Sequence, residues 1–104
     1  MSENAAPPAP TSRQDILNDR TRVTEWRLVP GASTGPHTHE YDYVIVPITR
    51  SRMRLDLPDG TTTYADLEPG VSYFRPTGNA HNVFNDGDGV MIFVEVELLE
   101  PAAK

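Results

Sequence analysis

The strongest constraint on the fold is a repeating pattern of short β-type segments separated by turn signals. Runs of four to nine residues rich in β-branched and aromatic side chains recur along the chain, and Gly, Pro, Asn and Asp cluster between them. No stretch of useful length has helical periodicity. The pattern predicts an all-β sandwich or barrel, with strands over Arg22–Val29, His37–Glu40, Tyr43–Ile48, Arg52–Leu57, Thr61–Ala65, Val71–Arg75, Ala80–Phe84 and Val90–Leu98.

Two of the expected strands also indicate where they lie in a sheet. Met53, Leu55 and Leu57 alternate with charged residues, as expected of a strand with one buried face. The first half of Val90–Leu98 is apolar on both sides, so we expect a central strand rather than an edge. Pro58-Asp59-Gly60 predicts a hairpin turn, because Pro fixes φ and Gly accepts a positive φ.

The length of the chain allows one domain. A chain of 104 residues is long enough to close a sheet around one core and too short for a second. Residues 1–12 are rich in Ala, Pro and Ser and bury too little to offset the entropy of ordering, so we expect a flexible tail there. Residues 101–104 predict a second tail, which leaves residues 13–100 as the barrel domain.

Composition excludes several classes of partner and site. Fifteen acidic residues against nine basic ones give a net charge of −6, and no Lys/Arg cluster interrupts it, so we expect neither nucleic acid nor an anionic membrane as a partner. The absence of cysteine rules out disulfides and thiolate metal sites. The N-terminus has no signal-peptide pattern and no apolar run approaches the length of a membrane span, so we expect a cytoplasmic protein.

The three histidines of the chain predict a metal site. His37 and His39 are two residues apart, so in an extended segment both imidazoles leave the same face of the sheet. His81 belongs to a separate predicted strand, which could pair across a closed barrel. Imidazole nitrogens from two strands suit one divalent ion such as Fe, Mn, Ni or Zn, with positions left for water or substrate.

The residues around these histidines resemble the two signature motifs of the cupin superfamily. The segment from Gly31 to His39, with its His-x-His end, matches the opening half of the first motif. The second motif is matched at every fixed position, by Gly70, Pro76, Gly78, His81 and Asn85. The resemblance implies a double-stranded β-helix, or jelly-roll barrel, with the three histidines as metal ligands.

One departure from the first motif puts the family's usual ligand set in question. Tyr43 stands where the family carries a metal-binding Glu, and Arg50 stands where the motif ends in Gly. Three arrangements stay open: a three-histidine site, as resemblance to some cupin dioxygenases would allow; a carboxylate supplied instead by Glu40, Asp42 or Glu95; or no metal. Ligand preferences favour the first, and Tyr43 would then line the pocket as a candidate catalytic residue.

The candidate substrate pocket takes in three further aromatic residues and one cation. Tyr41, Tyr73 and Phe84 fit strand propensity and core packing, and we assign them with Arg75 to the pocket lining. Alternation places Tyr73 and Arg75 on one face. If that face is the inner one, Arg75 could grip a carboxylate through two parallel hydrogen bonds; if not, it is solvated. The run Glu95-Val96-Glu97 is interpreted as a solvated strand end.

At a finer level, residues 13–99 resemble small bacterial cupins known as β-alanine degradation proteins. The similar stretches are Thr21–Trp26, His37–Val44 and Ser72–Arg75. This resemblance implies a pathway and no reaction. A first hypothesis is a metalloenzyme of the oxygenase, isomerase or lyase type, acting on a small carboxylate-bearing metabolite with Tyr43 as proton donor or acceptor.

Two other hypotheses remain. The barrel could be a non-catalytic module that binds a small molecule, or it could have a purely structural role in which replacing His37 or His81 changes nothing. The resemblance to small cupins further implies a homodimer, and a barrel of this size gains by covering an edge strand or an apolar sheet face with a second copy.

Overall fold

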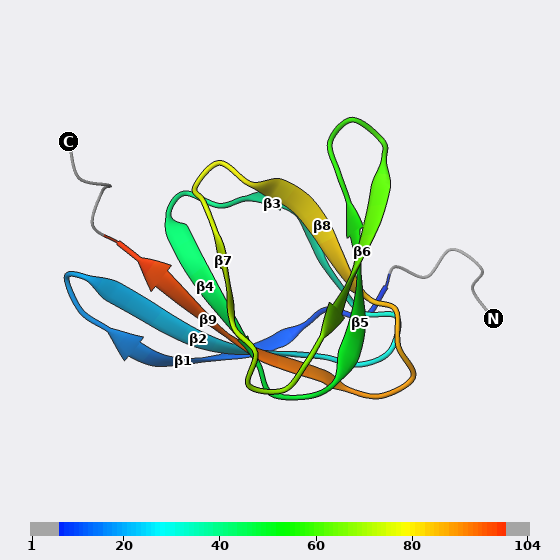
Figure 1. Cartoon of the computed structure of the whole chain (residues 1–104), viewed down its shortest axis with the longest axis horizontal. Coiled ribbons are helices and arrows are strands. Elements are labelled where there is room, and N and C mark those ends of the chain that lie inside the picture. The colour runs from blue at the N-terminus through cyan, green and yellow to red at the C-terminus, as the bar shows by residue number, and fades with distance from the viewer. Residues whose placement is uncertain (1–6, 100–104) are drawn as a thin grey trace.

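The computed structural model describes residues 7–99, and every regular element in this range is a β-strand (Figure 1). Residues 1–6 and 100–104, which include parts of the two expected tails and the last residue of the expected barrel domain, lie outside the described residues. No helix with the length and apolar character to cross a bilayer occurs within residues 7–99. The strands are β1 (Thr11–Leu17), β2 (Thr21–Leu28), β3 (Ser33–Thr38), β4 (Asp42–Pro47), β5 (Ser51–Asp56), β6 (Thr62–Leu67), β7 (Tyr73–Arg75), β8 (Ala80–Asn85) and β9 (Met91–Leu98).

Two antiparallel sheets make up the molecule, and Figure 1 shows them facing one another. One sheet has the order β1-β2-β9-β4-β7 and the other the order β3-β8-β5-β6. The all-β fold predicted from the sequence is therefore confirmed. β9 lies at the centre of the five-stranded sheet between β2 and β4, as the apolar residues on both of its faces predicted.

The turn between β5 and β6 forms as expected. Gly60 has a φ of 88° and donates its backbone N–H to the carbonyl of Leu57 at 3.0 Å. The Leu57 N–H in turn donates to the carbonyl of Thr61 at 2.9 Å. The positive φ explains why glycine stands at this position, because a side chain there would strain the backbone.

Strand β1 was missed by the sequence analysis, which predicted no strand over Thr11–Leu17 and assigned its first two residues to a tail. All seven of its residues are exposed, and it pairs with β2 through an irregularity between Gln14 and Ile16. Its sequence, TSRQDIL, has no alternating apolar face. Pairing with β2, and not local propensity, therefore accounts for the strand.

The apolar core lies between the sheets, and the inner face of β9 shows where it ends. Met91 and Phe93 point into this core, and Glu95 and Glu97 continue the same inner face with only 8% and 9% of their surface exposed. The interpretation of Glu95-Val96-Glu97 as a solvated strand end is therefore wrong. The buried residues of this core cluster are Leu28, Ala32, Tyr43, Ile45, Met53, Leu67, Val83, Met91 and Phe93.

Candidate metal centre

Strands β3 and β8 bring the three histidines together. His37 and His81 are direct cross-strand partners in this antiparallel pair. His39 follows the end of β3, where its N–H donates to the Asn79 carbonyl at 3.0 Å and its own carbonyl accepts from the Gly78 N–H at 2.8 Å. Gly78 has a φ of 86°, which suits the tight turn before β8. The turn of the second motif is thus hydrogen-bonded to the His-x-His segment of the first.

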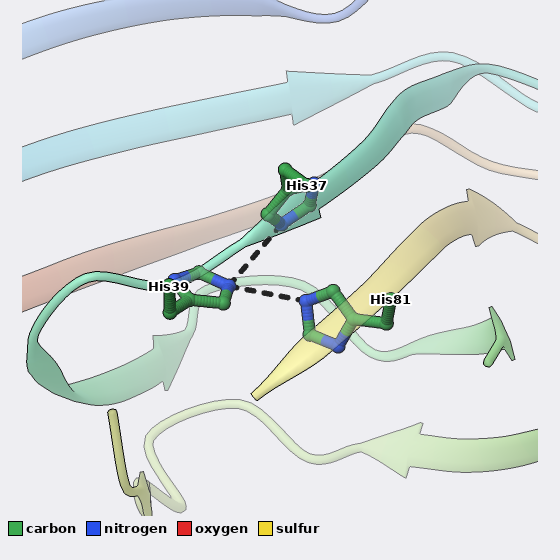
Figure 2. Close-up of side chains that lie close together, drawn as sticks. All are labelled: His37, His39 and His81. Carbon is green, nitrogen blue, oxygen red and sulfur yellow. Dashed lines mark hydrogen bonds between the residues drawn. The ribbon is translucent and has the colours of Figure 1, made fainter. Parts of the chain in front are cut away.

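The Nε2 atoms of the three imidazoles converge (Figure 2). The His39 Nε2 atom lies 3.2 Å from that of His37 and 3.1 Å from that of His81. Two ligands bound to one ion at about 2.1 Å, with an angle of about 90–110° between them, lie about 3.0–3.4 Å apart. The two separations that involve His39 therefore fit a common divalent ion, and the three donor atoms all lie within 4.8 Å of one another.

The Nδ1 atoms of two of these rings face partners that favour the same tautomer. The His37 Nδ1 atom lies 2.9 Å from the carbonyl oxygen of Gly35, which only accepts hydrogen bonds. The His39 Nδ1 atom lies 3.5 Å from a carboxylate oxygen of Glu95. A proton held on Nδ1 leaves the Nε2 lone pair free for a metal, so these contacts orient both rings as ligands.

Burial keeps two of the imidazoles neutral. Burial, reinforced by the neighbouring His37, lowers the pKa of His39 to about 4 and that of His81 to about 4. Neutral imidazoles are the form that binds Fe, Mn, Ni or Zn. The described residues contain one group of donors placed to hold a metal ion, and it consists of these three histidines.

Tyr43, in the position of the missing Glu ligand, closes one side of the centre. Its ring stacks on His39 with 3.8 Å between the centroids, and only 2% of the residue is exposed. Its hydroxyl accepts a hydrogen bond of 2.8 Å from the side-chain amide of Asn79. Burial raises the pKa of Tyr43, so the phenol keeps its proton at neutral pH.

None of the three carboxylates considered as substitute ligands joins the histidine group. Asp42 accepts a hydrogen bond of 2.8 Å from the Thr77 backbone and so holds a turn. Glu95 lies behind His39, on the Nδ1 side of the ring, away from the point where the Nε2 atoms meet. Glu40 lines the cavity beside the centre. Burial, reinforced by Glu97, raises the pKa of Glu95 to about 7.

The histidines open onto a cavity of about 570 Å³ inside the barrel. This volume lies within the range of small-molecule sites. Along β9 the inward-facing lining changes from Glu97, opposite Tyr43 of β4, to the apolar Phe93, opposite Pro47, so the cavity has a polar end beside Tyr43 and an apolar end. The lining residues are Ser12, Gln14, Arg22, Thr24, Trp26, Thr34, His37, Thr38, His39, Glu40, Tyr43, Ile45, Met53, Leu55, Ala65, Tyr73, Arg75, His81, Val83, Phe93, Glu95 and Glu97.

The polar wall contains residues that the sequence analysis did not assign to the site. Arg22 donates two hydrogen bonds to Glu97, at 2.6 and 2.9 Å, and the Trp26 indole N–H donates to Glu95 at 3.2 Å. Alternation could have found Arg22 and Trp26, because both share a strand face with the fully buried Leu28. Asn79 had no such signal, since it lies in a turn.

The four residues assigned to the substrate pocket divide into two pairs. Tyr73 and Arg75 line the cavity, and the Arg75 guanidinium lies 4.8 Å from the centre of the Tyr73 ring. Burial raises the pKa of Tyr73 to about 12. Tyr41 and Phe84 are not among the lining residues. Phe84 alternates with the inward-facing Val83, so its ring packs outside the cavity, 3.9 Å from the Arg54 guanidinium.

Comparison with known proteins agrees with the motifs. The cupin domain model matches residues 24–97. Over 89 residues the chain is 45% identical to the β-alanine degradation protein BauB of Pseudomonas aeruginosa. The matched region covers 86% of this chain and 90% of that protein.

Two solved structures have the same architecture. A cupin domain from Bordetella pertussis is 43% identical, with a TM-score of 0.87 and coverage of 91% of this chain and 98% of that one. The polyketide cyclase RemF from Streptomyces resistomycificus is 31% identical, with a TM-score of 0.68 and coverage of 90% and 68%. Relatives with and without a named reaction thus have the same barrel.

Proposed function

This chain belongs to the cupin family, and from that premise we propose that it is a metalloenzyme acting on a small carboxylate-bearing metabolite in amino-acid catabolism, such as the degradation of β-alanine. The observation behind the proposal is the convergence of three Nε2 atoms on one point at the polar end of an internal cavity. The name of the Pseudomonas relative supports the pathway.

His37, His39 and His81 would hold one divalent ion, Fe, Mn, Ni or Zn. A bound ion of this kind supplies a Lewis acid with coordination positions left for substrate or water. The rings of His37 and His39 contribute fixed orientation, because their Nδ1 atoms face the Gly35 carbonyl and Glu95. His39 and His81 contribute neutral nitrogen donors, because burial lowers their pKa values.

Tyr43 is the proposed catalytic residue. Its buried phenol keeps its proton and lies against the His39 ring, while the Asn79 amide fixes the direction of its hydroxyl. A phenol held in this way could donate a proton to a substrate oxygen or nitrogen and take one back later. Such a proton transfer is compatible with dioxygenase, isomerase or lyase chemistry.

Arg75 is the proposed substrate anchor. It lines the cavity and lies near the Tyr73 ring, so a substrate carboxylate could receive two parallel hydrogen bonds from its guanidinium. The anchor would hold the carboxylate end of the metabolite while the rest extends toward the histidines and Tyr43. We further propose that residues 13–100 form the working domain, in the cytoplasm and as a homodimer.

A second candidate function is binding without catalysis. The apolar end of the cavity, with Ile45, Met53, Leu55 and Phe93, suits a molecule that is held and not converted. The name of the Pseudomonas relative gives a pathway and no reaction, which is compatible with such a module.

The test begins with the elemental content of protein purified without a histidine tag, followed by reloading of stripped protein with Fe(II), Mn(II), Ni(II) or Zn(II). We expect one ion per chain and none in His39→Ala. Turnover is then measured with amino and keto acids. Tyr43→Phe should keep the ion and lose turnover, whereas Arg75→Gln should raise KM. Absence of metal in the wild type would overturn the metalloenzyme proposal, and ligand binding without turnover for any metal would favour the binding module.

A further inference from the structure

The cavity beside the histidines becomes apolar along its length and is then closed by the core. On the inner face of β9, Glu97 and Glu95 are followed by Phe93, which lines the cavity. The next inward residue is Met91, which has 0% of its surface exposed and does not belong to the lining. The interior therefore runs from a polar end beside the metal centre to an apolar end that is blocked by packed side chains.

The facing sheet changes in the same direction (Figure 1). On β8, Val83 comes two residues after His81 and shares its inward face. Val83 pairs with Leu55 of β5. Two residues away on β5, Met53 pairs with Ala65 of β6. Apolar side chains from both sheets therefore form the walls of this end: Ile45, Met53, Leu55, Ala65, Val83 and Phe93.

The cations that line the cavity lie at its other end. Arg22 on β2, Glu97 on β9 and Arg75 on β7 belong to one row, which crosses the sheet through Tyr43 on β4. Two hydrogen bonds join Arg22 to Glu97. Arg75 instead lies near the Tyr73 ring, so its guanidinium is the cation of this row that is available to a carboxylate.

The volume of the cavity exceeds what a compact amino acid requires. At the share of liquid volume that one water molecule takes, 570 Å³ corresponds to roughly 19 groups of that size. A free amino acid the size of β-alanine would fill about a third of this space and leave the apolar walls against water. Apolar surface is stabilised when it is removed from water, so these walls favour a ligand with an apolar part of its own.

We propose that the ligand of this cavity is an amphipathic carboxylate with an unbranched apolar tail. Its carboxylate would bind Arg75, its first carbons would lie beside the histidines and Tyr43, and its tail would fill the apolar end. The inference rests on the proposed function for the carboxylate anchor and adds the rest of the molecule. It also assigns Ala65 and Phe93, at the apolar end, as residues that set the length of the tail.

The strand geometry gives the length of the tail. Glu97, in the row of Arg75, is four residues from Phe93 along β9. Four residues of a strand span about 13 Å. An extended hydrocarbon chain advances about 1.25 Å per carbon, so an acid of about eight to ten carbons reaches from the anchor to the closed end.

The test is calorimetric titration with straight-chain acids from butyrate to dodecanoate and with β-alanine, on protein as purified and again after metal removal. Affinity should rise about fourfold with each added methylene, because each one leaves water for an apolar wall. The rise should stop at about eight to ten carbons, where the chain meets the core. Octan-1-ol, which lacks the carboxylate, should bind about tenfold more weakly than octanoate.

Variants at the two ends of the cavity separate the tail from the head. Ala65→Leu adds volume to the apolar end and should shorten the best acid by about two carbons. Phe93→Leu removes volume and should lengthen it. Tyr64→Leu is the matched control, because Tyr64 is the neighbour of Ala65 on β6, is 51% exposed and does not line the cavity. Arg75→Gln should weaken the binding of every acid by the same factor. Circular dichroism verifies that each variant is folded.

Three outcomes would overturn the inference: an affinity that does not depend on chain length, β-alanine bound as tightly as octanoate, or a best chain length that is unchanged in both folded variants of Ala65 and Phe93. Equal binding of all acids by Arg75→Gln and the wild type would exclude the carboxylate anchor. Chain-length dependence in protein that holds no metal would overturn the metalloenzyme proposal and keep this inference. Loss of that dependence in protein with one ion per chain would do the reverse.

Discussion

Near the histidines, the two faces of the five-stranded sheet reverse part of the usual distribution of residues. The inner face near the histidines carries Arg22, Thr24, Glu95 and Glu97, and of these Thr24, Glu95 and Glu97 are buried. The outer face of the same strands carries valines, among them Val23 and Val96. In an ordinary antiparallel sheet the apolar residues would point inward and the charged ones outward. The reversal indicates that the inside near the histidines is adapted to a polar ligand.

The inner face is stable only because its polar groups have partners. Burying a charge costs several kcal/mol unless it is paired and hydrogen-bonded, at about the scale of whole-domain stability. Among the described residues, no buried side-chain nitrogen or oxygen lacks a hydrogen-bond partner. The arginines paired with Glu25 on the outer face are exposed to solvent and depend less on their ion pairs. Matched changes on the two faces should therefore change the unfolding free energy by unequal amounts.

The largest effect should come from adding and removing metal. An ion that binds only the folded chain stabilises it by about 4 kcal/mol at a thousand times its Kd. The melting temperature of stripped protein should therefore rise by tens of degrees on loading, and a chelator should reverse the rise. The outer-face variant Val96→Thr should show the same rise in melting temperature on metal loading, whereas His39→Ala should show no rise. If the melting temperature of His39→Ala also rises on loading, the ion binds at another site.

The pH dependence of the stripped protein should be the next largest effect. Burial lowers the pKa of His39 and of His81 from 6.5 to about 4, so the unfolded chain takes up these protons first and stability falls as pH drops from 6.5 to 4. Glu95 acts in the opposite direction. Its pKa is raised from 4.5 to about 7, so the folded chain takes up that proton first and gains stability as pH falls from 7 to 4.5.

Between pH 6.5 and 4.5 the unfolded chain takes up two more protons than the folded chain on the histidines and one fewer on Glu95, so it binds one net proton more. Unfolding free energy should therefore fall by about 1.4 kcal/mol for each unit of pH lost, and in Glu95→Gln by about twice that amount. Urea titrations of stripped protein across this range measure both slopes. A stability that rises on acidification, or a Glu95→Gln slope equal to that of the wild type, would contradict the balance.

A matched pair of glutamates compares the two faces directly. Glu97, on the inner face, pairs with Arg22, and Glu25, on the outer face, pairs with Arg13 and Arg27. Glu97→Gln leaves a partly buried cation without its charge partner and should cost about 2 kcal/mol, between the values for exposed and buried pairs. Glu25→Gln should cost less than about 1 kcal/mol, because its arginines are exposed. Equal losses of unfolding free energy in the two variants, measured by urea titration, would show that the two faces do not differ in this respect.

Much of the fold could be predicted from the sequence, since turn chemistry and alternation are local properties. The strand of His81 and the hairpin at Gly60 follow from such signals. Strand β1 could not be predicted, because its stability comes from pairing with β2. Alternation also predicts that Glu95 and Val96 lie on opposite faces of the strand, without indicating which of the two points inward. The inward face is set by how the distant strands close into a barrel, and a short stretch of sequence does not contain that information.

The candidate site was predictable in part for the same reason. The motifs indicated His37, His39 and His81, and the structure brings their Nε2 atoms together. Phe84 was assigned to the pocket on its residue type, and its alternation with Val83 places it outside. Asn79 lies in a turn with no periodicity, so only the folded chain reveals its contacts with Tyr43 and His81.

The smallest effect, and the sharpest test of how the inner face is held, concerns Asn79. Its amide nitrogen lies 3.5 Å from the His81 Nδ1 atom and 2.8 Å from the Tyr43 hydroxyl. Metal binding through Nε2 requires a proton on Nδ1 of His81, so in the metal-bound protein the amide must turn over and present its oxygen to that ring. The oxygen then also accepts from the Tyr43 hydroxyl, in place of the N–H donation to that hydroxyl seen in this structure. Asn79→Ala removes this acceptor and should weaken metal affinity about tenfold, in the range for partners of ligating histidines. Asn79→Asp keeps an acceptor of the same shape and should retain the affinity. Competition against a chelator measures both variants, and an equal loss in the two would show that the amide only fills space.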